Sequence, residues 1–204
     1  MHYFSMFHCL FVCYHFAMTR LYFVRHADAY DELGVQLEES PLNNFGKIQS
    51  LQLAKRLKNN KFDAVYCSKV RRSIETCEIV NEHHKLKVIY NSHLNEIGSE
   101  NWPQPGTIMH NKDLVDFGFQ LEKIHKFYKR LLKENLSKEI LIFTHGNWIR
   151  ILLSKIVADG NPESFTHFVI SNSSLTIIDV EDDGFEHIIT VADAAHTHLY
   201  DTRI

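Results

Sequence analysis

Hydrophobic residues follow two alternating patterns along residues 20–156. Short, continuous apolar runs are typical of strands buried on both faces. Such runs predict strands at 21–24, 62–67, 86–90 and 139–144. Between them, apolar residues recur every three or four positions, as in amphipathic helices. These segments predict helices at 46–58, 68–83, 114–131 and 146–156. The second of them begins at Ser68, which we expect to be its N-cap.

Two of these helices carry further internal signals. The helix at 46–58 follows a turn at 41–44 whose asparagines suit the N-cap position. Its apolar residues at near-helical spacing are Ile48, Leu51, Ala54 and Leu57. The helix at 114–131 has a longer apolar stripe of the same kind. We interpret both stripes as faces packed on a core.

The alternation of strands and helices predicts βαβ units and therefore a mostly parallel sheet. Two late strands are expected at 175–180 and 187–191, joined by a turn at 182–184. The predicted fold class is α/β, a three-layer αβα sandwich with helices on both faces of the sheet. No repeat or internal linker divides the sequence, so we expect one domain over 18–204. In such sheets the ligand site lies at the carboxyl ends of the strands.

Composition narrows the possible partners. With 204 residues, 45% hydrophobic and 23% charged, the chain has the composition of a soluble globular protein rather than a disordered or multi-span membrane protein. The net charge is −3, so no global basic field supports nucleic-acid binding. An anionic substrate must then be attracted by a local cluster. The four cysteines form no CxxC motif, which favours a reducing, cytoplasmic compartment.

Residues 1–17 form an apolar leader with no charged residue before Arg20. A membrane anchor needs about 20 mostly apolar residues, and three histidines interrupt this stretch. A signal peptide would need a positive n-region and a small-residue cleavage site. We therefore favour an appended leader outside the fold, with Met18 as the functional start and membrane contact only if the leader is a real anchor. The spacing His8-Cys9-x3-Cys13-x-His15 matches no standard zinc site.

Polar side chains follow four of the predicted strands. They are Arg25 and His26 after the first strand, Ser68 and Arg72 after the second, Glu96 after the third, and His145 after the strand at 139–144. The carboxyl ends of parallel strands share one edge of a sheet, so we expect two histidines, two arginines and one glutamate to converge there.

This set of residue types suits phosphoryl transfer. Guanidinium groups make bidentate bonds to phosphoryl oxygens, and an imidazole can attack phosphorus. A second imidazole can stabilise the charge of the transition state. A carboxyl group can protonate the leaving oxygen and later deprotonate water. Arginine and histidine supply the positive charge, so we expect neither a metal nor a cofactor.

The ordered motifs resemble those of the histidine phosphatase superfamily, which has the phosphoglycerate mutase-like fold. The matching motifs are Arg25-His26-Ala27, Ser68-x3-Arg72-Ser73-x2-Thr76, Leu94-x-Glu96-Ile97 and Thr144-His145-Gly146. Weaker matches are Pro41-Leu42-x3-Gly46-x2-Gln49 and Asp193-x2-His196. The resemblance covers about residues 20–199.

The resemblance implies a role for each residue of the cluster. His26 would be the phosphorylated nucleophile and Glu96 the proton donor, while Arg25, Arg72 and His145 would hold the phosphoryl oxygens. Arg71 is the alternative to Arg72, because neighbours on a helix point about 100° apart and only one can face the site.

Three positions depart from the family pattern, and at one of them Asn147 replaces a frequent glycine. Ala27 stands where glycine is usual, and Ala29 stands where many members carry a hydroxyl residue that contacts substrate. The absence of a hydroxyl group at Ala29 disfavours a standard small-molecule pocket.

Several activities remain open within and beyond this family. We expect a phosphatase acting on phosphate monoesters, because a proton donor at Glu96 matters most for an alkoxide leaving group. A phosphoglycerate mutase-type phosphotransferase is the alternative, although residues 97–111 offer no Lys or Arg for a second anionic group. The substrate is a phosphorylated small molecule or a phosphoprotein. A catalytically silent scaffold is disfavoured because all five core residues are present.

Overall fold

The computed structural model describes residues 18–98 and 111–197. The leader predicted at 1–17 and the histidines and cysteines within it lie outside the described residues. The strands are β1 (Thr19–Arg25), β2 (Ala64–Cys67), β3 (Val88–Tyr90), β4 (Glu139–Thr144), β5 (Leu175–Val180) and β6 (Glu186–Asp193). The helices are α1 (Asn44–Leu57), α2 (Arg71–Asn81), the short 3-10 turn η1 (Ser92–Leu94), α3 (Asn111–Glu134), α4 (Gly146–Ala158) and α5 (Pro162–Phe165).

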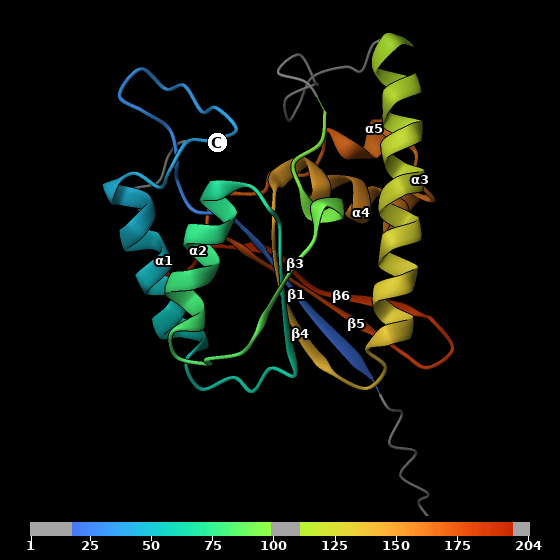
Figure 1. The fold of residues 1–204 in the computed structure, drawn as a ribbon. Helices are drawn as coiled ribbons and strands as arrows, with labels where there is room; N and C mark the ends of the chain where they lie inside the picture. The colour runs from blue at the N-terminus through green and yellow to red at the C-terminus, as the bar shows by residue number, and fades with distance from the viewer. Residues whose placement is uncertain (1–17, 99–110, 198–204) are drawn as a thin grey trace, which may run out of the picture.

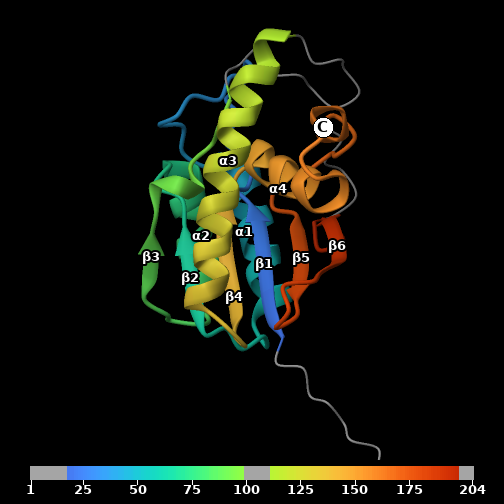
Figure 2. The ribbon, with the colours of Figure 1, turned by 90° about the vertical axis from the view of Figure 1, so that its right-hand side faces the viewer.

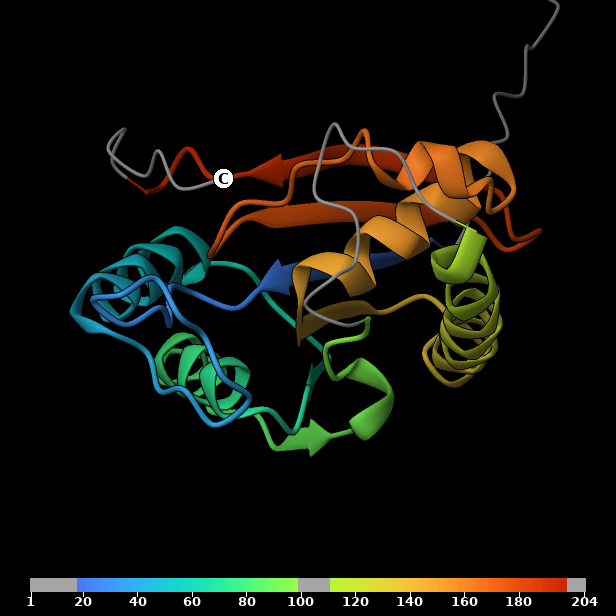
Figure 3. The same ribbon diagram turned by 90° about the horizontal axis from the view of Figure 1, so that it is seen from above.

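The six strands form one sheet in the order β3-β2-β4-β1-β5-β6. The pairs β3–β2, β2–β4 and β4–β1 are parallel, whereas β5 runs antiparallel to β1 and β6 antiparallel to β5. The helices α1 and α2 cover one face, and α3 and α4 cover the other (Figures 1 and 3). The predicted three-layer α/β fold with a mostly parallel sheet is confirmed.

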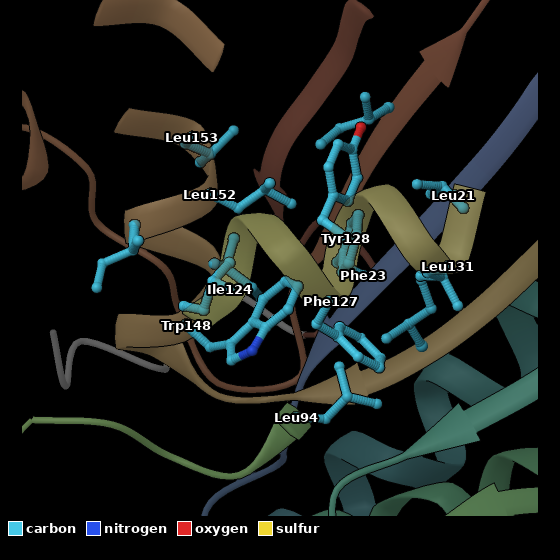
Figure 4. Close-up of a cluster of buried hydrophobic side chains, with 14 of the residues drawn as sticks. Leu21, Phe23, Leu94, Ile124, Phe127, Tyr128, Leu131, Trp148, Leu152 and Leu153 are labelled. Atoms are coloured by element: carbon cyan, nitrogen blue, oxygen red, sulfur yellow. The ribbon is translucent and has the colours of Figure 1, made fainter. Parts of the chain in front are cut away.

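Side chains of the central strands alternate between two cores. On β1, Leu21 and Phe23 point into the core under α3 and α4, and Tyr22 and Val24 point into the core under α1 and α2. Figure 4 shows the first of these cores, where Phe23, Trp148 and Tyr128 pack together. Burial on both faces explains why the central strands are continuously apolar. The view of Figure 2 shows the strands side by side behind α3, which runs across this face.

The buried face of α1 differs from the predicted one. Ile48 and Leu51 are 52% and 58% exposed, whereas Leu53, Ala54 and Leu57 are buried. The start of the helix packs on backbone rather than on apolar side chains: a Cβ at Gly46 would lie 2.0 Å from the carbonyl oxygen of Asp28. Because the helix approaches so closely here, the small and polar residues of its first turns face inward. Ile48 and Leu51 therefore face solvent.

The predicted N-cap of α2 is wrong. The helix begins at Arg71, and Val70 occupies the cap position without a side-chain hydrogen bond. The Ser68 hydroxyl instead accepts from the Val70 N–H and contacts a histidine of the site. The element boundaries also shift by a few residues, and the short α5 was not predicted because Pro162 to Phe165 is too brief to show a helical period.

None of the helices within the described ranges combines the length and apolarity needed to cross a bilayer.

Candidate active site

The carboxyl ends of β1, β2 and β4 and the connection after β3 bring the predicted cluster together. The ring centroids of His26 and His145 lie 5.1 Å apart. Ligand atoms of His26, Glu96 and His145 all lie within 4.8 Å of one another. Arg72 reaches the same point from the first turn of α2. Segments far apart in sequence therefore meet at one edge of the sheet, as the strand-end argument predicted.

The imidazole of His26 is buried and held in one tautomer. Its Nδ1 lies 2.8 Å from the carbonyl oxygen of Ala27, so Nδ1 carries the proton and donates it. Nε2 then has a lone pair, and the Nε–H of Arg72 donates to it at 3.1 Å. Burial, His145 and the nearby arginines lower the pKa of His26 well below its ordinary value of 6.5. The ring is therefore neutral at pH 7, with its unprotonated nitrogen inside the cluster.

Arg72 connects the two histidines and a neighbouring loop. Its Nη2 lies 3.4 Å from Nδ1 of His145, and its Nη1 donates to the carbonyl oxygens of Leu37 and Glu38 at 3.0 and 3.3 Å. A guanidinium makes such contacts simultaneously because its donors lie in a fixed plane. The side chain is thus oriented before any ligand binds.

His145 is oriented by Ser68. Its Nε2 lies 2.8 Å from the Ser68 hydroxyl, which in turn donates to the side-chain oxygen of Asn95 at 3.1 Å. Nε2 of His145 therefore carries the proton, and Nδ1 faces the Arg72 guanidinium. Burial and the charges of Arg72 and Arg25 lower the pKa of His145 well below 6.5.

Arg25 completes the positive side of the cluster. Its Nη1 donates to the carbonyl oxygen of Ile170, while its Nε is buried without a hydrogen-bond partner among the described residues. Gly146, the first residue of α4, lies against this side chain: a Cβ there would be in ordinary van der Waals contact with the guanidinium, 3.4 Å from Nε. An unsatisfied buried donor is costly, and an anionic ligand would satisfy it.

Glu96 supplies the carboxyl group of the cluster. It lies on the connection that follows η1, and its Oε1 accepts from the Ile97 N–H at 3.1 Å. A second backbone hydrogen bond comes from Asn147 at the start of α4. Burial raises the pKa of Glu96 above its ordinary value of 4.5, against the lowering effect of these bonds and of the arginines. A raised pKa favours the protonated form that can act as an acid.

The loop that carries His26 is braced by α1. Asn43 caps the helix, as predicted, by accepting from the Gly46 N–H at 2.8 Å. Its amide also donates to Asp28 and to the carbonyl oxygen of Tyr30. The Gln49 side chain accepts from the Asp28 N–H at 2.9 Å. The weaker motif around Gly46 and Gln49 therefore holds the backbone next to the nucleophile candidate.

Three residues of the matched motifs lie outside the cluster. The Arg71 side chain is 54% exposed and pairs with Glu75 at 2.8 Å, so Arg72 is the arginine that faces the histidines. Asp193 and His196 bind Arg56 on α1 instead of the site. The weaker C-terminal motif thus ties the end of the described chain to α1.

His26, Glu96 and His145 are also donor types that bind metal ions. However, Arg72 already donates to Nε2 of His26 and faces Nδ1 of His145. A cation among these atoms would lie against a guanidinium and compete for the same lone pairs. The positive charge of the two arginines therefore fits an anion better than a cation.

The sheet and this cluster define an α/β protein with two arginines, two histidines and a glutamate gathered at the carboxyl ends of its strands. A family description, the histidine phosphatase superfamily (branch 1), matches residues 21–116 and 117–192. The chain belongs to this superfamily, which confirms the resemblance of its motifs.

Individual relatives include both phosphatases and a mutase. The adenosylcobalamin/alpha-ribazole phosphatase of Escherichia coli (strain K12) is 24% identical over 188 residues, which cover 79% of this chain and 90% of that protein. A 2,3-bisphosphoglycerate-dependent phosphoglycerate mutase of Thermoplasma acidophilum is 25% identical over 155 residues, which cover 71% of this chain and 77% of that protein. A crystal structure of phosphoserine phosphatase from Entamoeba histolytica matches with a TM-score of 0.74 at 21% identity, covering 88% of this chain and 99% of that chain. At this identity the structural match shows the fold alone.

Proposed function

We propose that this protein is a phosphatase that hydrolyses phosphate monoesters through a covalent phosphohistidine on His26. The observation that carries the proposal is the neutral His26 ring, whose Nε2 lone pair lies in a positively charged cluster 3.1 Å from the Nε of Arg72. A nucleophile beside fixed cations suits attack on a phosphoryl group.

In the first step, Nε2 of His26 would form a bond to phosphorus as the ester P–O bond breaks. Arg25 and Arg72 would hold the equatorial oxygens. The phosphoryl dianion offsets the arginine charges, so His145 would take up a proton from solvent at Nδ1 as substrate binds. It would donate a hydrogen bond to a phosphoryl oxygen and return that proton to solvent when phosphate leaves. Glu96, protonated, would pass its proton to the leaving oxygen.

In the second step, the Glu96 carboxylate would accept a proton from water as the water oxygen attacks phosphorus. The P–N bond breaks, which releases inorganic phosphate and returns His26 to its neutral form. Each group ends in its starting protonation state. No metal takes part, so we expect EDTA to leave the rate unchanged.

Hydrolysis is favoured over mutase-type transfer by the charge around the site. The loop at 31–40, whose carbonyl groups bind Arg72, contains four acidic residues and no Lys or Arg. Residues 97–111 contain no Lys or Arg either. A mutase must bind a second anionic group of its substrate, and the acidic residues of the loop at 31–40 would repel such a group.

The test follows the phosphoryl group. With an aryl phosphate as substrate, we expect an acid-labile phosphoenzyme and transfer of the label to water. Addition of a phosphoglycerate acceptor should leave the yield of inorganic phosphate unchanged. Transfer of most of the label to that acceptor would establish a mutase, and absence of turnover on all monoesters would favour a silent scaffold.

The pH dependence of kcat/KM should report two groups. Because the pKa of His26 is lowered, the acid limb is expected below pH 6.5, once the ionisation of the substrate is corrected for. Because the pKa of Glu96 is raised, activity on an alkyl phosphate should decline on an alkaline limb that lies above pH 4.5. Measurement of kcat/KM against pH for wild type and Glu96→Gln checks both limbs. The variant should lose the alkaline limb and keep the acid limb.

We also propose that residues 18–204 suffice for catalysis in the cytoplasm. Two of the four cysteines, Cys67 and Cys77, are buried free thiols, which suits a reducing compartment. Fractionation of the full chain beside a version starting at Met18 tests this. Equal activity and equal distribution of both forms would support a dispensable leader, and membrane recovery of the full chain alone would identify an anchor.

A further inference from the structure

Arg150 is a buried charged residue that the chemistry above does not use. It lies one turn into α4 and is only 5% exposed. Its Cζ sits 3.7 Å from the centroid of the Phe165 ring, and its Nε donates to the Phe165 carbonyl oxygen at 3.1 Å. Its Nη1 donates to the side-chain oxygen of Asn147 at 3.0 Å. One guanidinium thus joins α5 to the first turn of α4.

Asn147 continues this chain of contacts to the carboxyl group of the site. Its side-chain amide donates to the carbonyl oxygen of Ile97 at 3.2 Å. Its backbone is hydrogen-bonded to the Glu96 carboxylate. Glu96 itself lies in neither a helix nor a strand, so its position depends on contacts of this kind. Arg150 fixes the rotamer of Asn147, and Asn147 fixes the segment that carries Glu96.

We propose that Arg150 is a positioning residue for Glu96 and acts through Asn147. The inference rests on the phosphatase function proposed above. A guanidinium suits the task because one planar group stacks on a ring and donates in two directions at once.

The buried charge of Arg150 is not explained well by a contribution to the stability of the fold. Burial lowers the pKa of Arg150 to about 10, which leaves it protonated at pH 7 but shows the cost of removing it from water. Replacement of a buried charge by an apolar side chain of similar volume is often neutral or stabilising. Arg150→Met should keep apolar packing on Phe165 while it removes the hydrogen bonds and the positive charge, including the charge that acts on Glu96, so the variant separates these polar effects from packing.

The experiment compares two leaving groups. An alkyl phosphate needs the proton of a well-placed Glu96, whereas a p-nitrophenyl phosphate leaves with little help. For Arg150→Met we expect kcat/KM to fall about tenfold on the alkyl ester and less than about twofold on the aryl ester. Asn147→Ala should show the same selectivity, and the double variant should lose no more than the worse single one.

Controls separate this role from general damage. Arg20→Met removes an arginine that pairs with Asp179 at 2.6 Å, at the opposite end of β1 from the site, and should leave the ratio of the two rates unchanged. Equal losses on both esters for Arg150→Met or Asn147→Ala would overturn the proposal, and so would additive losses in the double variant. If Arg150→Met does not fold, Asn147→Ala decides alone. An inactive wild type would instead refute the phosphatase function itself.

Discussion

Replacement of His26 by alanine is expected to lower phosphatase activity by about 10⁴-fold or more, because no other group can form the covalent intermediate. The buried Nε2 of His26 is unprotonated and accepts a hydrogen bond from Arg72, whereas Nε2 of His145 carries a proton that it donates to Ser68. A phosphoenzyme detected in wild type should be absent from the variant. Rapid-quench trapping with labelled substrate and steady-state rates on an aryl phosphate measure both.

The His26→Ala protein should still bind inorganic phosphate, because Arg25, Arg72 and His145 remain. Calorimetric titration with phosphate therefore shows whether the pocket is intact. His187→Ala is the matched control, since His187 pairs with Glu181 on the β5–β6 hairpin and should keep full activity. If His26→Ala keeps a tenth of the wild-type rate, another group is the nucleophile and the assignment of His26 is wrong.

The fold and the convergence of the cluster were predictable because each depends on a strongly periodic signal. Strands buried on both faces leave continuous apolar runs such as 140–143, and parallel strands end at the same edge of the sheet. Arg25 and His145 could be located from those ends, whereas the choice of Arg72 over Arg71 depended on the resemblance to the family motif.

Features set by contacts between distant segments could not be predicted in the same way. Ser68 has the sequence of an N-cap, but its hydroxyl is drawn to His145, which lies 77 positions away along the chain. Ile48 and Leu51 fit a helical stripe, but the close approach of Gly46 to Asp28 turns that stripe outward. Arg150 lies within an apolar helix, where a single charge carries no periodic signal.

The neighbours Arg71 and Arg72 offer the sharpest test of which cation binds the phosphoryl group. Arg72→Lys is expected to lower kcat/KM by about 10² to 10³-fold, the usual loss when one preorganised donor is removed. A lysine keeps the charge but has one compact ammonium group. It cannot contact His26, His145 and the carbonyl oxygen of Leu37 together, as the guanidinium does.

Arg71→Lys is the paired measurement, because the two residues share helix, charge and distance from the chain termini. Arg71 points to solvent and pairs with Glu75, a contact that a lysine can also make. Its kcat/KM should stay within about twofold of wild type, as expected for an exposed ion pair. The inhibition constant of inorganic phosphate should rise only for Arg72→Lys. A larger effect at Arg71 would mean that α2 presents the other arginine to substrate, and the geometry of the phosphate site would have to be redrawn around it.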